Sequence, residues 1–160
     1  MELLLRILQD AFFAAIAAVG FAAISQPPRR AFIYCALIAA VGHSCRMVLI
    51  DCADCHIVGA SLAASFLVGC LAVFLSPLAK MPAETSIFPA LLPMIPGMYA
   101  YRAFGGLLMC LLNGSESNFN HYFYLFASNG ITCLFILLAM AIGATAPIFL
   151  FKKISFQATR

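Results

Sequence analysis

Residues 87–112 read IFPALLPMIPGMYAYRAFGGLLMCLL, an apolar segment long enough to cross a bilayer but interrupted by Pro89, Pro93 and the pair Pro96-Gly97. Each proline lacks a backbone N–H, and its ring collides with the preceding helical turn. Inside a bilayer, the carbonyl groups that such a break frees must be satisfied by protein or by a water-filled cavity. The segment therefore predicts a broken transmembrane helix, and the break indicates a transport pathway or binding site.

The composition points to a membrane protein. Of the residues, 64% are hydrophobic and 9% are charged, so most side chains have no water-facing surface to occupy. A span needs roughly 20 residues, so the 160 residues have room for about five spans and no soluble domain. We expect an all-α integral membrane protein with a single transmembrane domain, residues 1–160.

Polar and proline-containing turns divide the chain into five predicted spans. We place these spans at residues 7–25, 31–50, 56–76, 87–112 and 122–151. An acidic turn, residues 51–54, separates the second from the third, and a polar loop, residues 113–121, precedes the fifth. The fifth is longer than a crossing requires, so it tilts, kinks at Gly143 or Pro147, or starts late.

The charges predict the orientation. The basic residues fall mainly on one side of a five-span arrangement and the acidic residues mainly on the other, which favours an outer N-terminus and an inner C-terminus. The basic set is Arg29, Arg30, Lys80, Lys152, Lys153 and Arg160, and the acidic set is Glu2, Asp10, Asp51, Asp54 and Glu116. We therefore expect a multi-pass membrane protein in this orientation.

The first span has an alternative interpretation as a cleaved signal peptide. Glu2 and Asp10 interrupt the positive charge that such a peptide needs around Arg6, which disfavours this interpretation. Arg6 and Asp10 are four residues apart and could form an ion pair on one helix face.

Small residues recur at four-residue spacing, a pattern that allows close helix packing in lipid. They are Ala14, Ala18 and Ala22, then Ser61, Ser65 and Gly69, and then Ala139 and Gly143. The sequence leaves open whether these faces pack within the chain or against another subunit.

Ionisable residues within the spans are costly and usually face an interior or a cavity. His43, Ser44 and Arg46 lie in the second predicted span, and Arg102 lies in the fourth, next to Tyr101. Arg46 either attracts a solute carboxylate or snorkels toward Asp51, Asp54 or lipid headgroups, and Arg102 has the same ambiguity. His43 is either a hydrogen-bonded interior histidine or a proton relay, since imidazole changes charge near neutral pH.

The break offers a second way to bind an anion. A half-helix that begins after Pro96-Gly97 would point unpaired backbone amides and its positive dipole end into the interior. Gly97 would let a solute approach the backbone closely. The alternative is a kinked structural helix whose prolines are covered by neighbouring helices.

These residues resemble a known family. Pro93-Met94-Ile95-Pro96-Gly97 with Tyr101 is similar to the P-x-x-P-G-x-x-x-Y element of the threonine/serine exporter (ThrE-like) superfamily. Residues 18–22, Pro28-Arg29, residues 35–37 and the Gly42-His43-Ser44-Cys45-Arg46-Met47 string resemble its small YjjB-type member. The similarity covers about residues 11–112.

The resemblance implies a function, a partner and a location in a bacterial cytoplasmic (inner) membrane. Chains of the YjjB type resemble one half of a two-component exporter that works with a larger YjjP-type membrane subunit. The family is associated with export of threonine and serine, or of short dicarboxylates such as succinate. The substrate-pathway residues that we expect are His43, Ser44, Arg46, Pro93, Pro96, Gly97, Tyr101 and Arg102, of which Arg102 does not map to the family element and is expected only as an ionisable residue within a span. The partners that we expect are the large subunit, the lipid bilayer and a small anionic or zwitterionic solute, and self-association into a homo-oligomer stays open.

The cysteines give one local motif. Cys52-Ala53-Asp54-Cys55-His56 matches the spacing of a c-type haem attachment site. A short turn between spans leaves little room for a porphyrin, so we favour a disulfide or unpaired thiols over haem, zinc or a redox site. We expect no cofactor and no metal.

Two classes of function remain, a transporter subunit and a non-transporting membrane scaffold or assembly protein. An enzyme is disfavoured, because no nucleophile with a base and no carboxylate pair is recognisable, and we expect no catalytic residues. Nucleic-acid binding is also disfavoured, since the basic residues are divided among short loops.

Overall fold

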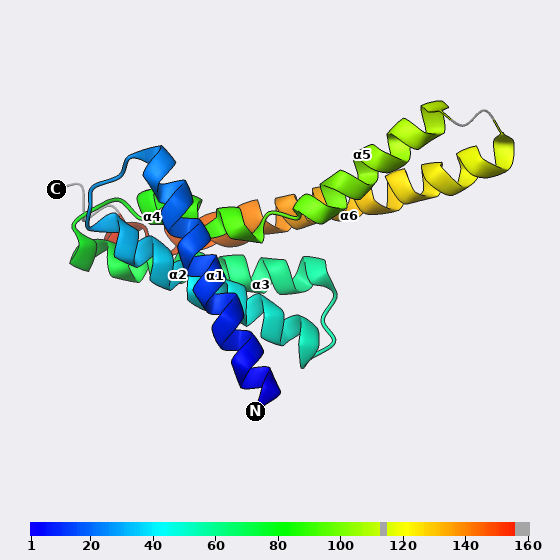
Figure 1. The fold of residues 1–160 in the computed structure, drawn as a ribbon. Helices are drawn as coiled ribbons and strands as arrows, with labels where there is room; N and C mark the ends of the chain where they lie inside the picture. The colour runs from blue at the N-terminus through cyan, green and yellow to red at the C-terminus, as the bar shows by residue number, and fades with distance from the viewer. Residues whose placement is uncertain (113–114, 156–160) are drawn as a thin grey trace. The chain divides into compact units, whose positions relative to one another are not determined.

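The computed structural model describes residues 1–112 and 115–155, which form helices and no strand (Figure 1). The elements are α1 (Glu2–Ser25), α2 (Ala31–Asp51), α3 (Ile57–Ala79), α4 (Glu84–Leu91), the 3₁₀ turn η1 (Leu92–Met94), α5 (Gly97–Leu112), α6 (Glu116–Leu150) and α7 (Lys152–Ser155). Arg160 and the side chain of Lys153, which were used to predict the orientation, lie outside the described part.

Four helices, α1, α2, α3 and α6, are each long and apolar enough to cross a membrane. A fifth candidate is the pair formed by α4–η1 and α5, which is interrupted at residues 95 and 96. The expectation of an all-α membrane protein with about five spans, the fourth broken by proline and glycine, is confirmed.

Some helix bounds differ from those predicted. α3 continues through Pro77 to Ala79 and ends where Lys80 adopts a left-handed backbone conformation (φ 51°). α6 begins at Glu116, so residues 116–121 are helical where we expected a loop. Glutamate in a first turn is favourable because it faces the positive end of the helix dipole, and a polar sequence outside the bilayer does not prevent a helix. α6 then runs without interruption through Gly143 and Pro147.

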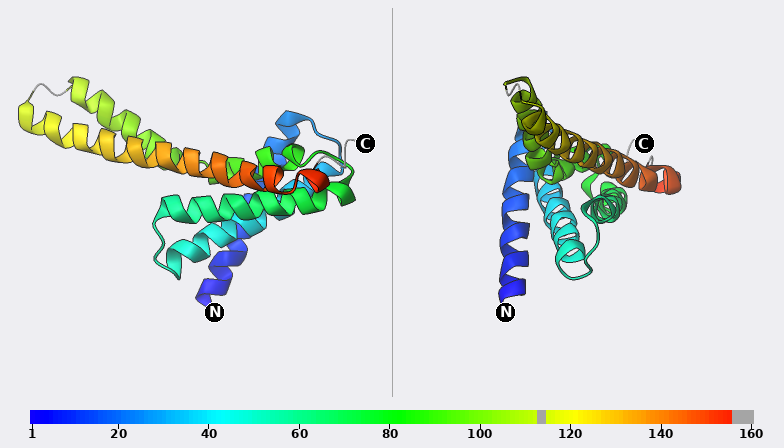
Figure 2. Two further views of the ribbon diagram at one scale, coloured as in Figure 1. Left: turned by 180° about the vertical axis from the view of Figure 1, so that it is seen from behind. Right: turned by 90° about the vertical axis from the view of Figure 1, so that its right-hand side faces the viewer.

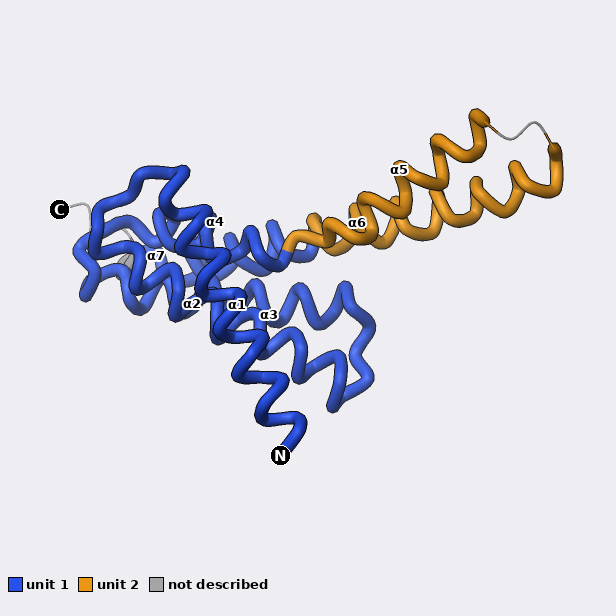
Figure 3. The backbone as a smooth tube through the Cα atoms, in the orientation of Figure 1, with its two compact units in different colours: residues 1–94, 139–160 blue, residues 95–138 orange. Residues whose placement is uncertain are grey.

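The helices form two compact units (Figure 3). The first comprises Met1–Met94 together with the chain from Ala139 onward, and the second comprises Ile95–Leu138. The break in the fourth predicted span coincides with the boundary between the units.

In the first unit, α2 is the central helix. α1 packs along it most extensively, α3 and α4 contact it too, and η1 contacts α1, α2 and α4 (Figures 1 and 2). The segment with the prolines is thus enclosed by other helices: Pro89 and Met94 are fully buried. Neighbouring helices therefore cover Pro89, which the structural alternative for the break required of every proline, whereas Pro93 is half-buried.

The small-residue faces are used for contacts within the chain. Ala14, Ala18 and Ala22 are buried, as are Ser61 and Ser65. A Cβ atom built on Gly69 would lie 2.5 Å from the carbonyl oxygen of Ala144, and one on Gly143 would collide with Ser65. The Ser65 hydroxyl also donates to the carbonyl of Ala139 at 3.4 Å. Of the two interpretations left open, packing within this chain is the one observed.

In the second unit, α5 packs against the N-terminal part of α6. Gly106 permits this contact, because a Cβ atom there would lie 2.9 Å from the carbonyl oxygen of Tyr122 and 2.8 Å from the amide nitrogen of Phe126. Gly105 faces open space, since a Cβ atom at that position would meet nothing within 4 Å.

Candidate functional site

A line of polar groups connects three elements of the first unit. Nδ1 of His43 in α2 lies 2.6 Å from Oδ2 of Asp10 in α1. Nε2 of the same imidazole lies 3.1 Å from Nη2 of Arg46, and Nη1 of Arg46 donates to the carbonyl oxygen of Met94 at 2.6 Å. The side chains of His43 and Asp10 are 19% and 25% exposed. We call Asp10, His43 and Arg46 the polar triad.

The local packing of α2 positions this triad. A Cβ atom on Gly42 would collide with the side chain of Val68, so glycine at this position allows α3 to approach α2 closely. His43 and Arg46 are three residues apart and therefore lie on one face of α2. Because an isolated charge within a bilayer is costly, Asp10 and Arg46 benefit from sharing the His43 imidazole as a hydrogen-bond partner in the protein interior.

The Arg46 side chain does not extend toward Asp51, Asp54 or the lipid headgroups, which was one of its two predicted positions. Its guanidinium points to His43 and to the last residue of η1. Asp10 contacts His43. An ion pair between Asp10 and Arg6 was one expectation from the sequence. Arg6 itself is exposed.

Backbone N–H groups after the break donate hydrogen bonds to nearby carbonyls, whereas we expected them to be unpaired and free to bind an anion. The N–H of Gly97 donates to the carbonyl of Ile95 at 2.8 Å, and those of Tyr99 and Ala100 donate to the carbonyl of Pro96 at 3.1 Å each. The reason is geometric: the tight turn before α5 folds these carbonyls back toward the first helical turn. The break therefore presents the Met94 carbonyl to a cation more clearly than it presents amides to an anion.

Ser44 lies apart from this line of contacts. Its buried hydroxyl has no hydrogen-bond partner and lines a pocket of about 440 Å³ between α1 and α2, with Ala11 and Val48 among its neighbours. The structure thus brings His43 and Arg46 together but places Ser44 beside a separate apolar pocket.

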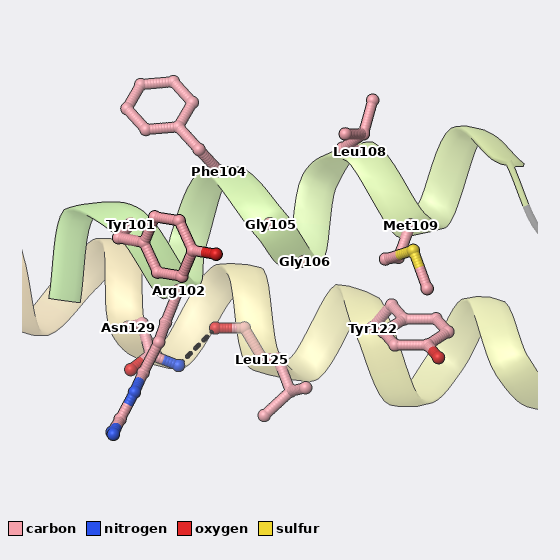
Figure 4. A pocket seen from close by; sticks show the side chains of 10 residues that line it. All are labelled: Tyr101, Arg102, Phe104, Gly105, Gly106, Leu108, Met109, Tyr122, Leu125 and Asn129. Atoms are coloured by element: carbon pink, nitrogen blue, oxygen red, sulfur yellow. Dashed lines mark hydrogen bonds between the residues drawn. The ribbon is translucent and has the colours of Figure 1, made fainter. Parts of the chain in front are cut away.

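Tyr101 and Arg102 line a larger pocket in the second unit, of about 710 Å³. Figure 4 shows its walls: Tyr101 and Met109 come from α5, and Tyr122 and Asn129 come from α6. The amide of Asn129 donates to the carbonyl of Leu125 at 2.7 Å. This pocket joins two predicted pathway residues to aromatic and polar groups that the sequence did not single out.

The remaining predicted residues lie at the break itself. Pro93 is half-buried, Pro96 is buried and Gly97 is exposed. The carbonyl of Pro96 also accepts a long contact, 4.0 Å, from the thiol of Cys133. These residues shape the interruption, and their part in a pathway stays a prediction.

Cys52 and Cys55 are exposed and free. Within residues 1–112 and 115–155, no group of three or more histidine, cysteine, aspartate or glutamate side chains is placed to hold a metal ion.

Comparison with known proteins identifies the family. The sequence model of the family described as "Threonine/Serine exporter, ThrE" matches residues 10–150. The chain belongs to this family. It is also 36% identical over 151 residues to a Haemophilus influenzae protein described as uncharacterized. The match covers 94% of this chain and 49% of that protein, so the chain spans about half the length of that relative. No solved structure matches the chain.

For this ThrE-family chain, sequence reasoning missed two parts of the site. Asp10 was interpreted only as an orientation signal and a possible partner of Arg6, although a carboxylate nine residues into a 24-residue apolar helix is itself a signal of an interior contact. The Met94 carbonyl has no signal of its own, because a backbone group becomes available through the break and not through its side chain.

Proposed function

We propose that this chain is a membrane subunit of a secondary exporter for small amino acids (threonine or serine) or short dicarboxylates such as succinate, working with a larger YjjP-type subunit in a bacterial inner membrane. Membership of the ThrE family supports the transport role. The relative about twice as long supports the need for a second part.

The observation that carries the proposal is the position of Arg46 at the break. Its guanidinium holds a backbone carbonyl and a neutral ring nitrogen, both weaker acceptors than a carboxylate. A carboxylate carries the opposite charge and can accept two parallel N–H bonds from a guanidinium, which adds energy and geometric specificity. A solute carboxylate can therefore replace these contacts, and in doing so it would loosen Arg46 from Met94.

The other pathway residues have supporting roles in this proposal. Pro93 lies in the 3₁₀ turn whose last residue, Met94, contacts Arg46. Pro96 lies in the interruption that precedes α5, and Gly97 is the first residue of that helix. Tyr101 and Arg102 provide a second polar lining in their own unit.

The test is efflux from cells that co-express the chain with its large subunit and are loaded with labelled serine, threonine or succinate. We expect faster efflux of at least one solute than from empty-vector cells. Efflux equal to the empty vector for all three would contradict the proposal. Arg6→Gln, an exposed cation of α1, is the matched control for Arg46→Gln.

Copurification of the two subunits separates transport from the scaffold alternative. Lost efflux with intact assembly in Arg46→Gln, Pro96→Ala or Gly97→Leu supports a transporter. Lost assembly supports a scaffold, although the small-residue faces that motivated that alternative are occupied within the chain.

A further inference from the structure

The geometry points to His43 as a proton-binding site whose occupancy is linked to the attachment of Arg46 to the break, with Asp10 as the positioning residue. This inference rests on the proposed function for its biological meaning, because it names the ion that acts at the proposed solute site. Its physical content is independent of which solute is carried.

The first step is the assignment of protons on the imidazole. Arginine has five N–H donors and no acceptor. Nε2 of His43, 3.1 Å from Nη2 of Arg46, must therefore be the unprotonated, accepting nitrogen. A neutral imidazole carries one proton, so it lies on Nδ1, which donates to Oδ2 of Asp10 at 2.6 Å. The observed contacts thus require neutral His43 in the Nδ1–H form.

The second step is what a proton on Nε2 would do. An N–H on Nε2 would face an N–H of Arg46, and two donors cannot share a hydrogen bond. The contact would also bring two cations together within an apolar surrounding. A doubly protonated His43 therefore cannot keep its hydrogen bond with Arg46. Protonation removes one of the two contacts that fix the Arg46 guanidinium, whereas the contact between His43 and Asp10 persists as an ion pair.

The third step links the proton to an anion. With an ionised Asp10, a neutral His43 and a charged Arg46, the polar triad has no net charge; one added proton makes it +1. A solute carboxylate at the freed guanidinium restores neutrality, so proton and carboxylate favour each other's binding. By thermodynamic reciprocity, lower pH tightens carboxylate binding by the same factor by which the carboxylate tightens proton binding.

Few other charged groups compete for this role. The elements that pack on α2 are α1, α3, α4 and η1. α3 contains no acidic, basic or histidine residue, with Cys70 as its titratable group, and α4 has only Glu84, exposed at its first position. On α1, Glu2 and Arg6 are exposed, and on α2 itself Asp51 is exposed at the C-terminal end. Within the part of the chain that the structure describes, Asp10 and Arg46 are the charged groups in contact with His43.

The test measures the imidazole proton directly. The full chain in lipid nanodiscs, with His56→Gln and His121→Gln so that His43 is the one remaining histidine, is labelled with ¹⁵N-imidazole histidine. Long-range proton–nitrogen correlation spectra then assign the tautomer. We expect the Nδ1–H form wherever the His43–Arg46 contact is present, and the doubly protonated form only where that contact is lost as the pH is lowered. Asp10→Asn should reduce the fraction of the Nδ1–H form, an effect that a merely structural Asp10 would not produce.

The second readout is the guanidinium of Arg46. Two engaged Nη groups restrict rotation about the Nε–Cζ bond, so we expect separate Nη signals that merge as His43 becomes protonated. In His43→Gln, which can still accept a hydrogen bond but does not titrate, the Nη signals should not change over the same pH range.

The outcomes separate this inference from the proposed function. An Nε2–H tautomer in neutral His43, a His43 that gains no second proton as the pH is lowered while the chain stays folded, or Arg46 signals that do not change when His43 gains a proton would each overturn the inference. None of these results depends on transport. Absent efflux together with the expected spectra would instead contradict the proposed function alone.

Discussion

Nη1 of Arg46 donates to the carbonyl oxygen of Met94 at 2.6 Å, although 48 residues separate the two in sequence. The contact attaches α2 to the last residue before the helix break. The break is thus stabilised by a side chain from another span, as expected for non-helical backbone at membrane depth. In the function that we propose, the guanidinium exchanges this carbonyl for a solute carboxylate.

Replacing Asp10 by asparagine should lower efflux while the subunits still assemble. Asparagine keeps the shape and one acceptor oxygen but loses the charge that orients His43. A hydrogen bond to a charged group contributes about 1.5–3 kcal/mol, so we expect a reduction of roughly tenfold. Efflux of labelled solute and copurification measure the two effects. Glu2→Gln, an exposed acid on the same helix, is the control, and unchanged efflux in Asp10→Asn would contradict the role of the triad.

Alanine at Gly69 should destabilise the first unit. The added methyl group would lie 2.5 Å from the Ala144 carbonyl oxygen and 2.9 Å from Cγ of Pro147. Such overpacking costs about 1–3 kcal/mol. The midpoint of thermal unfolding should fall; it can be followed in detergent, in a Cys52→Ser and Cys55→Ser background, with a thiol-reactive dye that reports exposure of the buried thiols of Cys35 and Cys110. Gly59→Ala adds its methyl group to open space and should leave the midpoint unchanged or slightly higher; equal midpoints for both variants would argue against this packing.

Gly105 and Gly106 form a pair of adjacent test positions in the second unit. Gly106→Ala places a methyl group against the α6 backbone at Tyr122 and Phe126, whereas Gly105→Ala does not meet a neighbour. Hydrogen exchange of the α5 amides, measured by mass spectrometry, should become faster in Gly106→Ala only. The α5–α6 contact would be contradicted if Gly105→Ala had the larger effect.

The orientation predicted from the charges can be tested on the turn between α2 and α3. Cys52 and Cys55 are exposed there, whereas Cys35 is buried. With the N-terminus outside, this turn also lies outside. A membrane-impermeant maleimide should therefore label Cys52 and Cys55 in intact cells, and Cys52→Ser with Cys55→Ser should abolish that labelling. Labelling confined to inside-out vesicles would reverse the orientation.

The sequence was sufficient to predict the all-helical fold and the break, because hydrophobic length and proline act locally. Helix ends were less predictable: Pro77 lies within α3, and residues 116–121 extend α6, since neither a terminal proline nor a polar sequence must end a helix. His43 and Arg46 were recognised as costly side chains in a span. Their partners were not, because Asp10 lies 33 residues from His43 and the Met94 carbonyl becomes an acceptor only through tertiary packing.

The sequence also could not predict which helix packs against each face of small residues. Four-residue spacing predicts that a helix face is smooth, but it does not say which helix covers it. In the structure, Gly69 faces Ala144 and Gly143 faces Ser65. Both contacts connect segments more than 70 residues apart, so only the folded chain assigns them.

The most direct test of the account compares Arg46 variants in proteoliposomes that contain both subunits and labelled threonine, serine or succinate. We expect Arg46→Gln to reduce the initial rate of solute movement by roughly tenfold or more, the equivalent of one lost charge-assisted hydrogen bond. Arg46→Lys should recover only part of the rate, because an ammonium group cannot hold a carboxylate with two parallel bonds. Full transport by an assembled complex with Arg46→Gln would contradict the claim that this guanidinium binds the solute.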